Sequence, residues 1–455
     1  MTRAVKACFV AGALLAMTAS AAWATGLTSF GFVGADGSIT TCVHNPDGSL
    51  RVLDPSSTKK DLTSCKRDET TVTFNQKGEK GDTGATGPAG PQGPPGSLPG
   101  PVNVTVDCTA GQSVQHALDT NAAATSIDIT IKGTCTEAVS TARDGVTLQA
   151  ASPGDGIAAP ASGDPPLSVV GGTVSLVGLT LTGGGQPALV ADTGATVQVQ
   201  DGHIVGPVGA GRDADVTLSN VTVDRGQGGG GVRAGLGGSI FVDGGSIAGG
   251  VGASTGGSVR LSDGVSVSSG GVGASNGGSI EIDGATISNP NPAGVGVEAD
   301  GGNVRVNGAT TVVSGNATGV EADNGGTATI MNGAQITGND IGVRANGGGH
   351  LAFGSDDGSG LGAIITHNSG DGVRVVAGST LRIYSVDVVS DNGGNGVTLS
   401  DTSVGDFINP TITGNGGIGV HCDGPPSTAV ERGPVNTVTG NDGGDVDCRN
   451  AGQPG

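Results

Sequence analysis

The most regular pattern along the chain is a short hydrophobic burst that opens with Gly-Val and recurs every 19 to 30 residues. Within Gly319-Val320-Glu321-Ala322 and Gly342-Val343-Arg344-Ala345, apolar and polar positions alternate, which is the period of a strand with one buried face. Internal repetition at this spacing predicts one coil of a parallel β-helix per repeat. The opening valines are Val232, Val251, Val272, Val297, Val320, Val343, Val373, Val397 and Val420.

Each repeat contains two further bursts separated by glycine or asparagine turns, as in Ala328-Thr329-Ile330 and Gln335-Ile336-Thr337. None of these bursts is long enough for a helix. The chain has 90 glycines among 455 residues, and a glycine inside a helix costs about 1 kcal/mol relative to alanine. A helical solenoid is therefore disfavoured, and we expect an all-β coil with three strands per turn.

Asparagine recurs at the third corner of the repeat, just before the next Gly-Val. Stacked coils would align these side chains into a ladder, because an amide can donate to one neighbour and accept from the other. The alternative is that they only form turns, a role for which asparagine is well suited. The residues are Asn316, Asn339, Asn368, Asn392, Asn415 and Asn441.

The recurring Ile/Val-Thr-Gly-Asn-x-x-x-Gly-Val resembles the repeat of right-handed parallel β-helix proteins, the pectate-lyase-like superfold, over roughly 350 residues. The resemblance implies a right-handed parallel β-helix over residues 151–450. It leaves the function open, since this superfold serves polysaccharide lyases, hydrolases, epimerases, adhesins and viral spikes.

Residues 1–24 have the features of a secretory leader: a basic start, an apolar stretch and the small-x-small sequence Ala22-Trp23-Ala24. We expect cleavage after Ala24 and an exported protein without a transmembrane segment. The formal net charge of -20 becomes 19 minus 41, or -22, once Arg3 and Lys6 are removed. So acidic a surface disfavours nucleic acid as a partner.

Six cysteines remain after the leader, and they fall into three local couples. An even number of cysteines in an exported chain predicts disulfides between nearest neighbours. Metal binding is the alternative, although no Cys-x-x-Cys spacing supports it. The couples are Cys42 with Cys65, Cys108 with Cys135, and Cys422 with Cys448.

Residues 78–95 form six uninterrupted Gly-x-y triplets, within the stretch 77–100 that links two parts of the chain. This period resembles collagen, in which only glycine fits at the axis of three chains, and it predicts a homotrimer. A flexible Pro/Gly linker is the alternative.

Residues 25–76 contain Cys42-Val43, Gly48-Ser49-Leu50-Arg51-Val52-Leu53, Cys65 and Phe74-Asn75-Gln76. They resemble a small module that precedes collagen-like repeats in bacterial secreted proteins, with Phe74 in place of a tryptophan. That family implies no enzymatic role. Because so short a fragment buries little surface, we expect a disulfide or assembly with other chains to stabilise it.

The stretch 101–150 should open the β-helix, with a strand over 104–108, a short amphipathic helix over 112–118 and a strand over 127–131. A helix there would cover the open end of the first coil. This stretch is similar to the N-terminal cap of secreted β-helix proteins. We expect a loop over 151–167 and a short tail over 451–455.

Three Asp-Gly corners, at Asp243, Asp263 and Asp283, are the candidate metal ligands. On consecutive coils their carboxylates would lie about 4.8 Å apart and repel one another unless a cation such as Ca²⁺ bridged them. Asp-Gly is also an ordinary turn pair.

Asp356-Asp357 and His367 lie in or beside the longest repeat, where Gly354 to Gly362 looks inserted. An acidic pair can act as acid and base in glycoside hydrolysis. The alternative is a solvated loop tip, because no Asn-Thr-Asp, Gly-His-Gly or Arg-Ile-Lys sequence accompanies the pair.

Outward charges on neighbouring coils are expected to pair with one another and have a structural role. These are Arg260, Glu281 and Arg305 on the middle strand, and Glu298, Glu321, Arg344 and Arg374 on the first. The mature chain has no tryptophan and one tyrosine, Tyr384, so few rings can stack on sugars. The sequence favours a secreted, structural or adhesive protein that presents a surface to carbohydrate or cell-surface ligands, without catalytic residues or an assigned cofactor. The alternative is an extracellular polysaccharide lyase or glycoside hydrolase.

Overall fold

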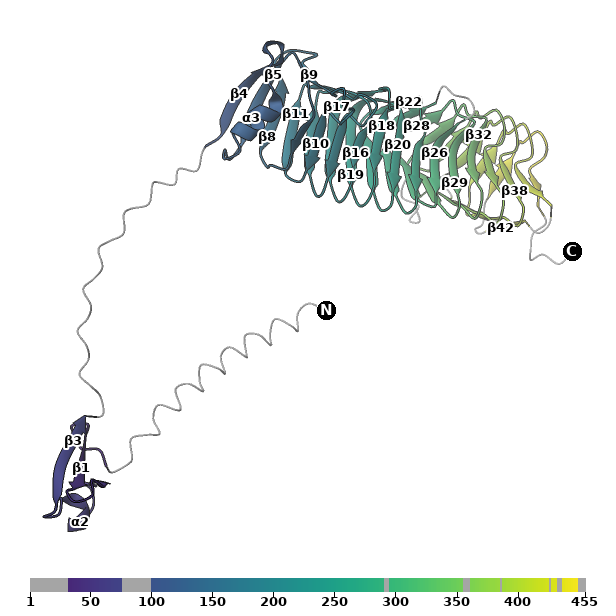
Figure 1. The fold of residues 1–455 in the computed structure, drawn as a ribbon. Helices are drawn as coiled ribbons and strands as arrows, with labels where there is room; N and C mark the ends of the chain where they lie inside the picture. The colour runs from purple at the N-terminus through teal and green to yellow at the C-terminus, as the bar shows by residue number, and fades with distance from the viewer. Residues whose placement is uncertain are drawn as a thin grey trace, which may run out of the picture. The chain divides into compact units, whose positions relative to one another are not determined.

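The computed structural model describes residues 32–75, 100–289, 294–354, 361–384, 387–424, 427–431 and 436–448. The chain divides into two compact units, Met1–Pro94 and Pro95–Gly455. The first carries a three-stranded sheet, and the second is a solenoid (Figure 1). The predicted leader, the Gly-x-y triplets and the C-terminal tail lie outside the described residues.

The second unit is an all-β parallel β-helix, which confirms the fold class predicted from the sequence. Each coil gives one strand to each of three parallel ladders, which we call the first, second and third sheets. The second and third sheets join in β17 (Asp215–Asp224) and β19 (Ser239–Ala248), which are long enough to serve both. A positive φ of 53° at Asn220 and of 67° and 85° at Gly244 and Gly245 allows the bend within these two strands.

The first sheet contains the Gly-Val bursts. Its strands are β7 (Val139–Thr141), β10 (Leu167–Val170), β13 (Leu189–Asp192), β16 (Val208–Ala210), β18 (Gly231–Ala234), β20 (Gly250–Ser254), β23 (Val272–Ser275), β26 (Val295–Asp300), β29 (Thr318–Asp323), β32 (Ile341–Ala345), β35 (Val373–Val375), β38 (Val397–Ser400), β41 (Val420–Asp423) and β44 (Val446–Asp447).

The second sheet contains, besides β17 and β19, the strands β4 (Val102–Asp107), β5 (Ile127–Lys132), β8 (Val146–Ala150), β11 (Thr173–Val177), β14 (Thr196–Gln200), β21 (Ser258–Ser262), β24 (Ser279–Asp283), β27 (Asn303–Asn307), β30 (Thr327–Met331), β33 (His350–Phe353), β36 (Thr380–Ile383), β39 (Val404–Phe407) and β42 (Thr428–Glu431). The third adds β6 (Thr134–Thr136), β9 (Gly156–Ala158), β12 (Thr180–Thr182), β15 (His203–Val205), β22 (Ser266–Ser268), β25 (Thr286–Ser288), β28 (Val312–Ser314), β31 (Gln335–Thr337), β34 (Ile364–Thr366), β37 (Val388–Ser390), β40 (Thr411–Thr413) and β43 (Thr437–Thr439).

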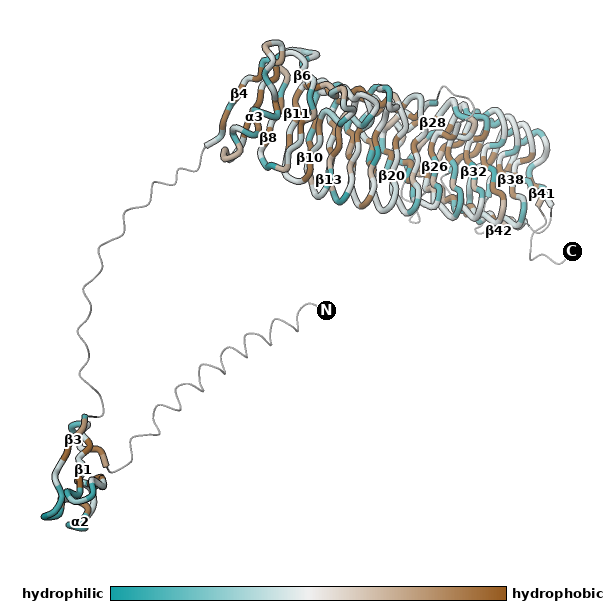
Figure 2. The backbone as a smooth tube through the Cα atoms, in the orientation of Figure 1, coloured by the Kyte–Doolittle hydropathy of each residue, from teal (hydrophilic) through white to brown (hydrophobic). Residues whose placement is uncertain are grey.

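The opening valines stack in register through the first sheet, as the repeat spacing predicts. Val297 lies opposite Val320, and Val320 lies opposite Val343, and all three are fully buried. Hydrophobic positions recur from coil to coil along the solenoid (Figure 2). Each coil packs chiefly on the coils next to it, and the buried residues of successive coils together form one continuous aliphatic core.

The asparagines of the third corner form a continuous ladder in the structure. The Nδ2 of each donates to the Oδ1 of the next at 2.8–3.1 Å, and its backbone N–H donates to the same oxygen at 3.0–3.2 Å. All six side chains are buried. They therefore tie consecutive coils together as well as forming turns.

A helix, α3 (Val114–Thr120), lies at the N-terminal end of the solenoid (Figure 1). At the start of α3 the Glu137 carboxylate accepts from the Ser113 hydroxyl and the Val114 N–H, both at 2.7 Å. Near its end, the Arg143 guanidinium donates to the carbonyls of Leu118, Asn121 and Ala124. The predicted loop over 151–167 is wrong in part, since it contains β9, whose glycine passes close to the backbone of Thr180 on the next coil.

Three disulfides join nearest neighbours in the sequence: Cys42 with Cys65, Cys108 with Cys135, and Cys422 with Cys448. The second follows β4 directly and links the 3-10 helix η1 (Cys108–Ala110) to β6. The third links β41 to the residue after β44, and so joins the last two coils of the first sheet.

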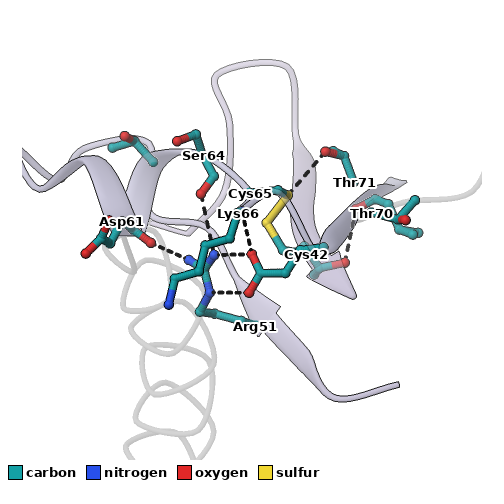
Figure 3. The surroundings of a disulfide bond; sticks show 12 residues. Cys42, Arg51, Asp61, Ser64, Cys65, Lys66, Thr70 and Thr71 are labelled. Atoms are coloured by element: carbon teal, nitrogen blue, oxygen red, sulfur yellow. Dashed lines mark hydrogen bonds and ion pairs between the residues drawn. A yellow bond between two sulfur atoms is a disulfide. The ribbon is translucent and has the colours of Figure 1, made fainter. Parts of the chain in front are cut away.

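The first unit contains β1 (Ser38–His44), β2 (Leu50–Val52), α2 (Lys60–Thr63) and β3 (Glu69–Asn75). The strands pair antiparallel in the order β2-β1-β3. On one face, the Arg51 guanidinium donates to the Asp61 and Ser64 carbonyls and pairs with the Glu69 carboxylate, next to the Cys42–Cys65 disulfide (Figure 3). We call this unit the N-terminal module.

Candidate functional site

The outer face of the second sheet brings aromatic and charged side chains into one column. The parallel register places Phe241 beside Arg260, Arg260 beside Glu281, and Glu281 beside Arg305. These residues occupy outward positions because the residues on either side of them, such as Ile240 and Val242, point into the core. The predicted stacking of the middle-strand charges is confirmed, and Phe241 extends the column by one coil.

Arg260 links the aromatic ring to the acidic side chain. Its Cζ lies 5.8 Å from the centroid of the Phe241 ring, and its Nη1 lies 3.9 Å from Oε2 of Glu281. The Arg260 side chain is 51% exposed, so each contact stabilises the fold by less than about 1 kcal/mol. The guanidinium therefore keeps donors facing solvent.

Two depressions meet at this pair of residues. One, of 550 Å³, extends from Phe241 and Arg260 towards Asp215 and Glu281. The other, of 420 Å³, extends towards Asp263 and Asp283. Because both are lined by Phe241 and Arg260, they form one surface hollow, which we call the Phe241–Arg260 groove.

The three aspartate corners do not stack as the sequence analysis expects. Asp243 lies opposite Ser262, and Ser262 lies opposite Asp283, so a serine separates the first and third carboxylates. Asp263 follows one residue later, at a left-handed turn with φ 53°. The expected register is wrong because this turn displaces Asp263 by one position.

Asp243 and Asp263 are nevertheless neighbours. A hydrogen bond with the Asp243 carboxyl, and the negative charge of that group, raise the pKa of Asp263, while the Arg260 charge opposes the shift. Two carboxyl groups this close stay together by sharing a proton or a cation. Asp263 lines the groove with Arg260, and the pair could hold Ca²⁺ through its oxygens. Among the described residues, three potential ligand atoms converge within 4.8 Å at Cys42, Cys65 and Glu69, where both sulfurs are already in the disulfide.

The outward charges of the first sheet stack in register, but the predicted pairing of opposite charges holds only for Glu321 with Arg344, since Arg374 pairs with Asp371. Glu298 lies opposite Glu321, which lies opposite Arg344, and Arg344 lies opposite Arg374. Nε of Arg344 is 3.6 Å from the Glu321 carboxylate. Burial raises the pKa of Glu321, and the Arg344 charge counters that effect. Burial and then the charges of nearby Asp300 and Asp323 raise the pKa of Glu298.

A second hollow, of 330 Å³, lies on the first sheet between Arg233 and Glu298. Its floor is backbone, because Gly252 and Gly273 occupy the outward positions between those charges. No aromatic ring lines it among the described residues. It therefore lacks the stacking surface that distinguishes the Phe241–Arg260 groove.

Asp356 and Asp357 of the predicted insertion lie outside the described residues. His367 is exposed, in a left-handed turn, with its Nδ1 2.8 Å from the Thr366 hydroxyl. Beside the insertion, Asp387 is fully buried, a feature that sequence reasoning missed. Burial raises the pKa of Asp387 to about 7, although the N–H groups of Ala363 and Tyr384 both donate to its carboxylate at 2.7 Å. Those contacts give Asp387 a structural role.

No family model and no curated protein matches this sequence. Two solved structures are similar in fold. One is a mutant of the periplasmic alginate epimerase AlgG, 11% identical, with a TM-score of 0.36 over 68% of this chain and 76% of that chain. The other is the A-module of the mannuronan C-5 epimerase AlgE4 from Azotobacter vinelandii, 14% identical, with a TM-score of 0.30 over 74% of this chain and 93% of that chain. No helix within the described ranges has the length and apolar character needed to cross a bilayer.

Proposed function

We propose that this protein is secreted and binds an extended polysaccharide along the Phe241–Arg260 groove. The half-buried Phe241 ring carries the proposal, because it lines the groove together with an arginine and carboxylates on a polar β-sheet face. Saccharide sites combine a ring for stacking with a few polar groups that fix orientation. Most other outward neighbours in the groove are hydroxyl side chains, namely Thr217, Ser239, Ser258 and Ser279.

The charge of the groove favours an uncharged polysaccharide. Asp215, Glu281, Asp263 and Asp283 line the two hollows, against one lining arginine. A polyuronate would meet this acidic surface unfavourably unless a cation neutralised it. Uronate chains are therefore expected to bind when Ca²⁺ occupies the Asp243–Asp263 pair.

Three disulfides support export, because such bonds persist in oxidising compartments. Together with the leader, they support an extracellular or cell-surface location. The Gly-x-y triplets support a homotrimer, which would multiply the number of grooves that one polysaccharide chain can contact. A stiff solenoid with three copies of a weak site suits an adhesive role.

A polysaccharide lyase is the second candidate, and Arg260 near the neighbouring carboxyl groups of Asp243 and Asp263 favours it. In a β-elimination, the charged Arg260 would bind the uronate carboxylate, and an ionised carboxylate of the pair would take the proton from the carbon next to it. The C–O bond would break, and the pair would protonate the leaving oxygen. Glycoside hydrolysis fits less well. The two catalytic carboxyl groups of a glycosidase stand about 5 Å or more apart, whereas the carboxyl groups of Asp243 and Asp263 are close enough to form a hydrogen bond.

Binding of the mature chain to pectin, alginate, hyaluronan and chitin, with and without Ca²⁺, tests both candidates. Phe241→Ala and Arg260→Gln should each weaken binding at least about tenfold, the equivalent of one lost stacking or charge contact. Arg344→Gln is the matched control, since that arginine lies on the first sheet. Equal binding by all variants would refute the groove, and new unsaturated ends in any polysaccharide would favour the lyase.

A further inference from the structure

The N-terminal module has one covered face and one bare apolar face. Antiparallel pairing sets Ile39 opposite Phe74, Thr41 opposite Val52 and Val72, and Val43 opposite Leu50. Side chains that lie directly opposite each other project from the same face of a sheet. That face therefore carries Ile39, Val43, Leu50, Val52, Val72 and Phe74, together with the buried Thr41 and with Thr70 at its edge.

The opposite face is already occupied. It holds the Cys42–Cys65 disulfide, and Cys42 is fully buried there. It also holds the ion pair of Arg51 with Glu69, at 2.5 Å, and the contacts of Arg51 with the segment around α2 (Figure 3). The side chains that stabilise the module by itself thus belong to a single face.

The bare face is exposed to an unusual degree for large apolar side chains. Leu50 is 61% exposed, Phe74 is 52% exposed and Val52 is 42% exposed. Within the described part of the module, the buried hydrophobic residues are Cys42 and Leu53. A three-stranded sheet with so small a core is marginal alone and gains stability when the bare face is covered.

The position of this face along the chain indicates what covers it. Strand β3, which carries Phe74, ends at Asn75, and the Gly-x-y triplets begin at Gly78. Glycine at every third position fits a helix of three chains, yet six triplets are short for such a helix to hold by itself. Three modules brought together at the head of the triplets would present three apolar faces at very high local concentration.

We infer that the Ile39–Leu50–Phe74 face is the contact through which three copies of this chain associate, and that it sets the register of the triplets. Each copy contributes the same patch, so the three faces close around a threefold axis. The inference rests on the trimer of the proposed function and adds the surface that forms it. It is independent of the polysaccharide and of the groove.

Sedimentation equilibrium of the mature chain tests the inference. The wild type should have the mass of three chains, and Leu50→Asp with Phe74→Asp should raise the dissociation constant at least about 100-fold, because charges would enter a buried apolar contact. Leu50→Asp alone should have a smaller effect in the same direction. Thr73→Asp is the matched control, since Thr73 is exposed on the opposite face of β3.

The possible outcomes distinguish a wrong assignment of the contact surface from a wrong assignment of the trimer. A trimeric wild type and control with dissociated Leu50 and Phe74 variants would support the contact. A trimer that persists in the double variant would overturn the contact and leave the trimer standing. A monomeric wild type would overturn both the contact and the trimer. All variants should have no free thiol, which shows that the module has folded.

Discussion

Replacing Asn392 with alanine tests how much the asparagine ladder stabilises the coils. The Asn392 Nδ2 donates to the Asn415 Oδ1 at 2.9 Å and to the Ile365 carbonyl at 3.2 Å. Its Oδ1 accepts from the Asn368 N–H at 3.1 Å and from the Asn368 Nδ2 at 2.9 Å. The substitution removes four buried hydrogen bonds to groups on the two neighbouring coils. The Asn368 N–H loses its partner, whereas the Asn415 Oδ1 still accepts from the backbone N–H of residue 392.

At about 1 kcal/mol of net stabilisation per hydrogen bond, the four bonds together stabilise the fold by about 4 kcal/mol. Water can enter the space left by the amide and satisfy some partners, so we expect the free energy of unfolding to fall by about 2 to 4 kcal/mol. Urea unfolding followed by circular dichroism measures this change. Because solenoid coils interact mainly with their neighbours, the loss should appear first as local opening around coils 365–415.

Asn303→Ala is the matched control. Asn303 is exposed on an outward position of β27, so the same chemical change there should alter stability by less than about 0.5 kcal/mol. If Asn392→Ala proved as mild as Asn303→Ala, the ladder would be turn chemistry alone and our account of coil stacking would be refuted.

Three further predictions concern stability. The pKa of Asp387 is raised from 3.8 to about 7 in the folded state, so the folded protein binds a proton that the unfolded chain has lost, and the free energy of unfolding should fall as pH rises through that window. Asp387→Asn keeps an oxygen for the Ala363 N–H but has no proton to lose, so the free energy of unfolding in urea should differ less between about pH 5 and about pH 8. An unchanged difference would show that other groups cause the pH dependence. Replacing Cys422 and Cys448 with serine opens a loop with a sequence separation of 26 residues and should destabilise the C-terminal coils by about 3.5 kcal/mol. Proteases should then cut the C-terminal end earlier than in the wild type. Equal resistance to proteolysis would show that the disulfide does not stabilise the last coils. Val320→Asp puts a charge at a fully buried position and should lower the melting temperature sharply, and a variant that melts like the wild type would show that the inward assignment is mistaken.

The stacking of coils could be predicted from the sequence because it depends on a short, repeated signal. The Gly-Val opening recurs in the coils from β18 to β41, and the strand period of two fixes which residue of each burst points inward. Val320 and Val343 therefore align as expected. The Asn corners could be predicted for the same reason, since the distance from each Asn to the next Gly-Val is nearly constant.

The groove could not be predicted, because its residues are neighbours only after the register is known. Phe241 lies in Ile240-Phe241-Val242, where three apolar residues in a row hide which one faces outward. The long strand β19 continues through the corner that the Asp243-Gly244 sequence suggests, with its bend at Gly244 and Gly245. The single left-handed residue at Asp263 then breaks the expected column of carboxylates.

Asp387 escaped prediction for a different physical reason. Asp387 directly precedes β37, and nothing in its sequence neighbourhood marks it as buried. Burial follows from the approach of Gly354, a residue of the preceding coil, where an added Cβ would lie 3.2 Å from the Asp387 carboxylate. Contacts of this kind depend on loop lengths in adjacent coils and leave no local pattern.

A crystal structure of the mature protein with a bound oligosaccharide tests the central claim most directly. The account predicts a sugar ring packed on Phe241, with Arg260 donating to a sugar oxygen and the chain extending towards Asp215 on one side and Asp283 on the other. A saccharide bound over the glycine floor of the first sheet, with the Phe241 ring still facing solvent, would contradict it.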